Sequence, residues 1–164
     1  MTIAIAEYDS RWPALFWHEA ERIRGALGSL ALRIEHTGST SVEGLAAKPI
    51  IDITLVVADS SNEAAYVPAL EGAGYVLKIR EPEWHQHRMF KGPDTDVNLH
   101  VFSAGCTEVE RILLFRDWLR VHAADRELYE ATKRRFARKQ WDTVQNYADA
   151  KTAVIEEILK RAAS

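Results

Sequence analysis

The chain has 164 residues, a formal net charge of −3 and charged residues at 27% of the total, which is the composition of an ordinary globular protein. This length is enough to bury a proper core in one domain. The charge and the lack of Lys/Arg blocks argue against a dedicated nucleic-acid surface, because phosphate backbones are bound by concentrated basic faces. No uninterrupted apolar run approaches the roughly 18 residues that a membrane span requires.

The single cysteine, Cys106, cannot form an internal disulfide. The first residues show no basic stretch followed by a long apolar one, so no export signal is predicted. Both features favour a reducing cytoplasm as the setting of this protein.

The first third of the chain predicts a helix and then two strands. The helix is expected over residues 11–27, with Asp9 and Ser10 as its cap and Gly28 at its end. Alternating apolar residues predict a strand at 32–37. The β-branched run at 49–57 predicts a second, buried strand.

The middle of the chain predicts a short helix at 63–71 and strands at 75–79, 87–90 and 96–102. The turn Gly92-Pro93-Asp94 should join the last two strands as an antiparallel hairpin. This order of elements predicts an α+β (α/β-type) fold with a mixed sheet of about four or five strands flanked by helices on one face.

From Cys106 onward the pattern changes to three helices. They are expected at 108–122, at 125–139 with Asp125 as the cap, and from a cap at Asp142 and Thr143 to the C-terminus. No flexible linker precedes them. We therefore predict an α/β core at 1–105 and a helical subdomain at 106–164, packed together as one compact unit with a cleft between them.

The loop between the first two strands, HTGSTSVEGLAAKP at 36–49, has the parts of an anion-binding turn. Gly38 permits backbone angles that other residues resist, Ser39 adds a hydroxyl, and successive amides in such a turn can point at one oxyanion. Lys48 follows just before the next strand. The alternative is a Ser/Thr-rich turn with a helix cap, and the spacing leaves both interpretations open.

Asp52 interrupts the apolar strand at 49–57. A bare carboxylate is costly to bury, so Asp52 must lie at a strand end, meet a cation or collect hydrogen bonds. With the Gly38-Ser39 loop before it, the pattern suggests phosphate on one side and a divalent metal ion on the other.

The stretch HTGSTSVEGLAAKPIID at 36–52 resembles the signature of the GrpB family, also called UPF0157. Later segments agree with it, namely NLHV at 98–101, FRDWLR at 115–120, and two Tyr-x3-Lys pairs at 129–133 and 147–151. The resemblance covers nearly the whole chain. It implies the nucleotidyltransferase fold, and a relation to the module found behind some dephospho-CoA kinases.

The same resemblance implies a second carboxylate two residues beyond Asp52, where this chain has Thr54. On a later strand Asp96, Asn98 and His100 share one face, but only Asp96 is acidic and it lies near the hairpin turn. The site expected for Mg²⁺ or Mn²⁺ therefore has few acidic ligands. Its candidate ligands are Asp52, His100, Asn98 and His36.

Histidines offer a second interpretation of the metal site. His36, His100 and His87 could meet Asp52 across the sheet and bind Zn²⁺. The alternative is that each histidine hydrogen-bonds a neighbour, because a sequence cannot show that side chains converge.

Tyr129 and Lys133, and likewise Tyr147 and Lys151, are four residues apart, so each pair shares a helix face. The tyrosine can stack on a base and the lysine can meet a phosphate. Alternatively, the lysine stems pack along the tyrosine rings. In the resemblance both pairs match family positions, which favours ligand binding. For Arg116 two positions are expected from the sequence: its side chain reaches the cleft or it forms an ion pair.

Three functions are compatible with these residues. The first is metal-dependent nucleotidyl transfer, with Asp52 and Ser39 as catalytic residues. The alternative is a non-catalytic module that binds a nucleotide or a CoA precursor, and a histidine-ligated metallohydrolase comes third. In the first two the partner is a nucleotide or another phosphorylated small molecule. The expected ligand-binding residues are Gly38, Ser39, Lys48, Arg116, Tyr129, Lys133, Tyr147 and Lys151.

Overall fold

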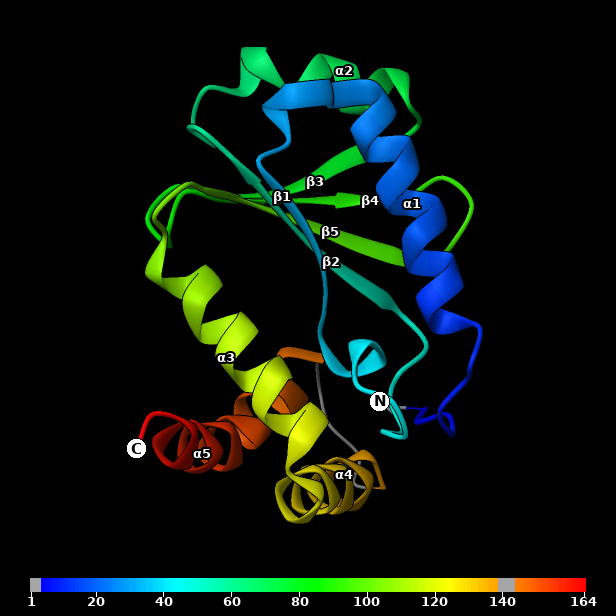
Figure 1. The fold of residues 1–164 in the computed structure, drawn as a ribbon, viewed down its shortest axis with the longest axis vertical. Coiled ribbons are helices and arrows are strands. Elements are labelled where there is room, and N and C mark those ends of the chain that lie inside the picture. The colour runs from blue at the N-terminus through cyan, green and yellow to red at the C-terminus, as the bar shows by residue number, and fades with distance from the viewer. Residues whose placement is uncertain (1–3, 139–143) are drawn as a thin grey trace.

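The computed structural model describes residues 4–138 and 144–164, and these form one mixed five-stranded sheet with helices on both sides (Figure 1). The strand order is β1-β2-β5-β4-β3. Strands β2 and β5 run parallel, and the other neighbouring pairs are antiparallel. The strands are β1 (Arg33–Thr37), β2 (Ile51–Val57), β3 (Val76–Glu81), β4 (His87–Lys91) and β5 (Val97–Ser103).

Two helices, α1 (Trp12–Leu27) and α2 (Val67–Gly72), lie over one face of the sheet (Figure 1). The main core is buried there: Ile23 of α1 packs with Ile53 and Leu55 of β2 and Leu99 of β5, and all four are fully buried. Successive strand residues point to opposite faces, so Asp52 and Thr54 face the other side.

That other side is where the three C-terminal helices gather (Figure 1). They are α3 (Thr107–Val121), α4 (Ala123–Ala137) and α5 (Val144–Ala162). Helix α3 packs on the sheet through Val109 and Leu113, which meet Val56 and Phe102. No helix in the described ranges is long and apolar enough to cross a lipid bilayer.

The register of the two central strands brings the polar residues of this face together. Asp52 is the pairing partner of Asn98, and Thr54 is the partner of His100. The short β4–β5 connection makes these strands an antiparallel hairpin, as predicted. The sequence-based prediction of an α+β fold with a mixed sheet of about four or five strands is therefore confirmed.

Several predicted boundaries were wrong. Residues 63–71 are not one helix, because a 3₁₀ turn at Glu63–Ala65 precedes α2. Asp125 does not cap α4, which already begins at Ala123. Instead the Asp125 carboxylate accepts a hydrogen bond from Trp118 Nε1 at 2.7 Å and pairs with Arg161 of α5. The predicted caps at residues 142 and 143 lie outside the described residues.

Candidate functional site

The loop that follows β1 is shaped by Gly38. This residue has φ 70° and ψ −177°, a conformation that is essentially restricted to glycine. A Cβ atom at this position would stand 2.9 Å from Asp52 Cβ and would overlap Asp52 Oδ2. The loop backbone therefore comes against the Asp52 carboxylate in a way that no other residue type allows.

Side-chain hydrogen bonds hold this loop in place. His36 Nε2 lies 3.0 Å from Thr40 Oγ1, and the Thr40 hydroxyl also lies 3.2 Å from the carbonyl oxygen of Ile50. From α3, Arg120 Nη2 donates to the Ser41 carbonyl oxygen at 2.9 Å. The Ser39 hydroxyl, by contrast, has no hydrogen-bond partner in the described part of the chain, so it is available to a ligand.

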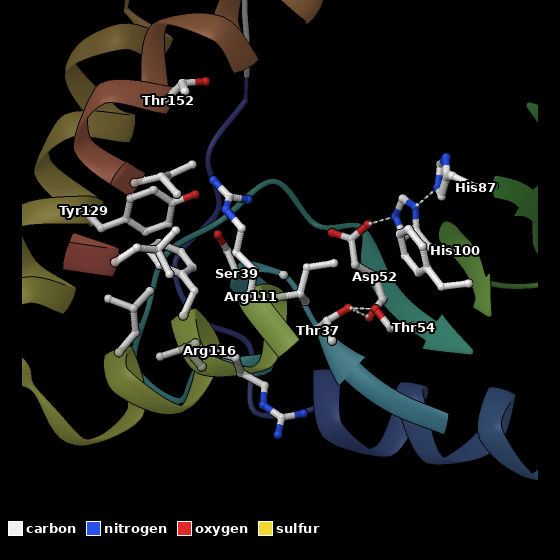
Figure 2. A pocket seen from close by; sticks show the side chains of 18 of the residues that line it. Thr37, Ser39, Asp52, Thr54, His87, His100, Arg111, Arg116, Tyr129 and Thr152 are labelled. Carbon is white, nitrogen blue, oxygen red and sulfur yellow. Dashed lines mark hydrogen bonds and ion pairs between the residues drawn. The ribbon is translucent and has the colours of Figure 1, made fainter. Parts of the chain in front are cut away.

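A large cleft of about 740 Å³ lies between the sheet and the C-terminal helices (Figure 2). Its sheet wall is polar and includes Asp52, His100 and Glu81, whereas its helical wall is mainly apolar and includes Phe115 and Ile155. A ligand that fits this cleft would present polar groups to the sheet and an apolar or aromatic face to α3 and α5.

A second, smaller cavity of about 160 Å³ shares Ser39 and Asp52 with the large cleft. Three lysines from separate parts of the chain line it: Lys48 from the loop, Lys133 from α4 and Lys151 from α5. We call it the lysine cavity. It also contains Asn98, so it brings together six of the residues predicted from sequence as site residues: Ser39, Lys48, Asp52, Asn98, Lys133 and Lys151.

The lysines raise the positive potential of this cavity. Burial, followed by the charge of Lys151, lowers the pKa of Lys133 to about 7, and its Nζ donates to the Ala46 carbonyl oxygen at 2.6 Å. Burial, followed by the charge of Lys48, lowers the pKa of Lys151 to about 8. An anion entering the cavity would relieve this repulsion, because it favours the charged forms of both lysines.

Asp52 stands where the two cavities meet. Its Oδ1 lies 3.1 Å from His100 Nε2, and within the described residues Oδ2 has no hydrogen-bond partner. Thr54 cannot replace the second carboxylate of the transferase pattern: it is fully buried and its hydroxyl bonds that of Thr37 at 2.9 Å. Asn98 Oδ1 accepts a hydrogen bond from Lys91 Nζ at 2.7 Å, which competes with any metal ion for this oxygen.

His36 faces the α1 side of the sheet, opposite to Asp52, and lines neither cavity. Its ring stacks on Phe16 with 4.9 Å between the ring centres, and burial lowers its pKa to about 4, so the ring is neutral at pH 7. In this structure its role is to support Thr40 in the loop.

Two other predicted residues line the large cleft. Arg116 pairs with Glu35 at 2.8 Å and donates to the His36 carbonyl oxygen at 3.1 Å, so it fastens α3 to β1. Tyr129 packs edge-on against Phe115, and Lys133 Nζ lies 5.0 Å from the centre of its ring. Tyr147 is part of α5, but its side chain lies outside the described residues.

The turn between β3 and β4 brings further residues to the cleft that the sequence did not single out as a group, namely Glu81, Trp84 and His87. The one available signal was a tryptophan among polar residues in the turn EPEWH at 81–85. His87 was considered either as a zinc ligand or as a histidine that hydrogen-bonds a neighbour, and in the structure it contacts Glu81 and His100.

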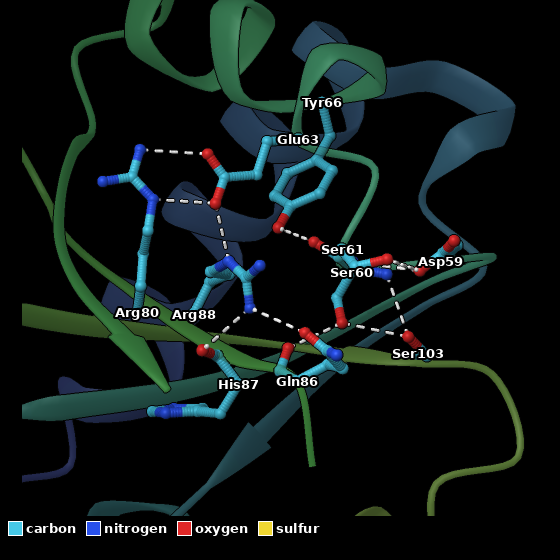
Figure 3. Close-up of polar contacts among 10 residues, drawn as sticks. All are labelled: Asp59, Ser60, Ser61, Glu63, Tyr66, Arg80, Gln86, His87, Arg88 and Ser103. Atoms are coloured by element: carbon cyan, nitrogen blue, oxygen red, sulfur yellow. Dashed lines mark hydrogen bonds and ion pairs between the residues drawn. The ribbon is translucent and has the colours of Figure 1, made fainter. Parts of the chain in front are cut away.

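A polar network holds this turn (Figure 3). His85 and Gln86 have positive φ values of 55° and 50°, and the Ser60 hydroxyl donates to the Gln86 carbonyl oxygen at 2.7 Å. The buried Arg88 donates to Glu63 at 2.7 Å. These contacts compensate for the strained backbone and fix the position of the turn beside the cleft.

Among the described residues, one group of three histidine or carboxylate side chains is close enough to hold a metal ion: His18, Glu19 and Asp94. It lies on α1 and the β4–β5 turn, away from both cavities. Arg22 already pairs with Asp94, and its Nη2 lies 3.1 Å from His18 Nε2. The cation at this cluster is therefore the guanidinium group of Arg22.

The sheet order and the Gly-Ser loop beside Asp52 belong to a nucleotidyltransferase-like fold. The structure of the Cid1 poly(U) polymerase with MgGTP superimposes with a TM-score of 0.62 and 14% identity, covering 85% of this chain and 46% of that one. At this identity the likeness shows the fold alone.

The family is also established. The chain belongs to the GrpB family, whose sequence model, described as "GrpB protein", matches residues 2–161. A UPF0157 protein of Halalkalibacterium halodurans is 60% identical over 161 residues, which is 98% of this chain and 83% of the relative. The crystal structure of the conserved protein GrpB from Enterococcus faecalis matches with a TM-score of 0.83 and 28% identity, covering 98% of this chain and 100% of that one.

A more distant relative is a dephospho-CoA kinase. The dephospho-CoA kinase of Mycolicibacterium paratuberculosis is 27% identical over 180 residues, which is 94% of this chain and 44% of the kinase. The relation to dephospho-CoA kinases that the sequence implied is thus confirmed.

Proposed function

We propose that this protein binds a nucleotide, or another small molecule with a phosphate chain, with its phosphates in the lysine cavity. The observation that carries the proposal is the convergence of Lys48, Lys133 and Lys151 on a small cavity beside the Ser39 hydroxyl. Three ammonium groups around one cavity form an anion site, and phosphate oxygens are well suited to it.

Mg²⁺, or Mn²⁺, would be held by Asp52 Oδ2 together with phosphate oxygens and water. Mg²⁺ is commonly bound in this way, by one or two carboxylates and the substrate's phosphates, so a single free carboxylate oxygen fits it. When bound, the ion would neutralise charge on the phosphates. His100 contacts the other oxygen of Asp52, and Asn98 lies beside it in the lysine cavity.

The reaction that this arrangement supports is nucleotidyl transfer to a hydroxyl acceptor in the large cleft. The acceptor oxygen would form a bond to the α-phosphorus of the nucleotide while the bond to the pyrophosphate oxygen breaks, and the proton of the acceptor hydroxyl would be lost to water. The lysine cavity would then stabilise the negative charge of the departing pyrophosphate. The apolar wall of α3 and α5 would bind the organic part of the acceptor.

A second candidate is a module that binds a nucleotide or a CoA precursor without turnover. One observation favours it: Thr54 stands where the fold's second carboxylate is expected, and it is fully buried in a hydrogen bond to Thr37. Release of pyrophosphate from ATP in the presence of Mg²⁺, lost in Asp52→Asn, would distinguish transfer from binding.

The binding proposal is tested by calorimetry with ATP. Lys151→Ala should weaken ATP binding about tenfold or more, because a charge-assisted contact to phosphate is lost. Lys160→Ala is the matched control, since Lys160 is an exposed lysine on the same helix that lines neither cavity. Equal affinities for the two variants would contradict the assignment of the lysine cavity.

A further inference from the structure

Four side chains on four neighbouring strands lie end to end at hydrogen-bonding distance. Because the two end carboxylates only accept, all three contacts are hydrogen bonds when the two imidazole rings together carry three hydrogens. Asp52 Oδ1 lies 3.1 Å from His100 Nε2, His100 Nδ1 lies 3.0 Å from His87 Nε2, and His87 Nδ1 lies 2.6 Å from Glu81 Oε1. The four residues come from β2, β5, β4 and β3, which is their order in the sheet. Figure 2 shows Asp52, His100 and His87 along one wall of the cleft. We call these four residues the Asp52–Glu81 string.

The middle of the string is closely packed. His87 is 5% exposed, and its ring centre lies 5.0 Å from that of Phe102, 5.1 Å from that of Trp84 and 5.2 Å from that of His100. Burial lowers the pKa of His87, although its hydrogen bond to Glu81 acts in the opposite direction. A ring enclosed by three others cannot turn freely, so its two nitrogens stay directed at Glu81 and His100.

The string contacts only one of the two carboxylate oxygens of Asp52. Oδ1 faces His100, whereas Oδ2 faces the backbone of Gly38, as the overlap with a Cβ atom there shows. The free oxygen is therefore on the side of the Gly38-Ser39 loop. A carboxylate fixed in this way offers one oxygen to a ligand instead of two.

We propose that Glu81 and His87 are positioning residues that act through His100 to fix Asp52, so that only Oδ2 is presented to the Gly38-Ser39 loop. Partners of this kind, one step removed from a ligand, commonly set the orientation of the group that makes the contact. The orientation of the Asp52 carboxylate does not depend on any ligand. The effect of this orientation on ligand affinity rests on the proposed function.

A purely structural role of Glu81 predicts a different result for the His100 ring. If Glu81 only fastened the β3–β4 turn to His87, its loss would loosen the turn without changing the state of the His100 ring on the neighbouring strand. The His100 ring nitrogens therefore distinguish positioning from fastening. They can be observed by ¹H–¹⁵N NMR correlations, which report which nitrogen of each ring carries a hydrogen.

The test compares Glu81→Ala with Glu83→Ala, which removes an exposed glutamate from the same turn and leaves the string intact. Glu81 is 46% exposed, so its removal is compatible with folding. In Glu81→Ala we expect the His87 and His100 ring nitrogens to move toward the average of two tautomers. Affinity for ATP with Mg²⁺ should fall about tenfold, and affinity for ATP alone should stay unchanged.

Glu81→Gln retains an acceptor oxygen and should recover part of both effects, whereas Glu83→Ala should show neither. Unchanged His100 ring signals in Glu81→Ala would overturn the positioning role. If the ring signals move but the wild-type protein does not bind ATP under any condition, the proposed function fails and the positioning role stands.

Discussion

At the scale of single residues, the contact between Gly38 and Asp52 is the most specific feature of the site. Gly38→Ala would place a methyl group against Asp52 Oδ2 and would strain the backbone at φ 70°. We expect a loss of about 1–3 kcal/mol in the free energy of unfolding. Affinity for ATP with Mg²⁺ should fall more than the affinity for ATP alone, because Asp52 is displaced. Calorimetry and thermal unfolding measure these effects.

Gly44→Ala is the control for this prediction. Gly44 belongs to the same loop and also has a positive φ, of 82°, but a Cβ atom there would meet nothing within 4 Å. This variant should share the backbone strain and leave Asp52 in place. If both variants lost the metal-dependent part of ATP binding equally, strain in the loop would explain the result and the Gly38–Asp52 contact would not.

A site residue could be predicted from the sequence only where its neighbours along the chain mark it. Gly38, Ser39 and Asp52 were singled out because a glycine before hydroxyls and a carboxylate in an apolar strand are visible along the chain. The Asp52–Glu81 string was predicted only in part: His100 and His87 were expected to meet Asp52 as zinc ligands, whereas Glu81 was not expected there, because strand pairing across the sheet brings it to them. A sequence shows which face a residue takes, but not which strands become neighbours.

At the scale of elements, the β3–β4 turn depends on the pairing of Glu63 with Arg88. Arg88→Gln should cost about 1–3 kcal/mol of stability, because the side chain is 7% exposed and its removal leaves a buried hydrogen-bonding site incomplete. Arg80 also pairs with Glu63 but is 59% exposed, so Arg80→Gln should cost only about 0–1 kcal/mol. Denaturant unfolding measures both values, and equal losses would contradict the central role of Arg88.

Elements were predicted well where burial dominates and less well at their ends. The strands β1, β2 and β5 are alternating or β-branched runs, and this pattern defined them within a few residues. Asp125 was misinterpreted as a helix cap because a carboxylate early in a helix often has that role. Its partners, Trp118 and Arg161, lie on other helices, and tertiary contacts of this kind have no local signature.

At the scale of the whole molecule, the lysine cavity joins parts of the chain that are far apart in sequence. Lys48 belongs to the loop before β2, whereas Lys133 and Lys151 come from helices on the opposite wall. Their mutual repulsion opposes closure of the two walls, and an anion between them removes it. The free energy of folding and the affinity for phosphate should therefore both depend on the protonation of these lysines.

The sign of this dependence follows from the pKa of Lys133, about 7 in the folded chain against an ordinary value of 10.5. Between these values the unfolded chain binds more protons, so this lysine makes the free energy of unfolding rise with pH from about 7 to about 10.5. ATP binding favours the ammonium form, so affinity should fall as pH rises above about 7. At pH 8 binding should take up between about one and two protons, the larger share by Lys133 and the smaller by Lys151.

Calorimetry of ATP binding in two buffers with different ionisation enthalpies measures this uptake. Lys133→Met keeps most of the apolar stem and should remove the larger part of the uptake, because Lys151, with a pKa of about 8, is already half protonated at pH 8. At pH 6 both lysines are charged before ATP arrives, so their contribution to the buffer dependence should vanish even in the wild-type protein. A wild-type uptake that is the same at pH 6 and pH 8 would mean that the phosphates bind away from these two lysines.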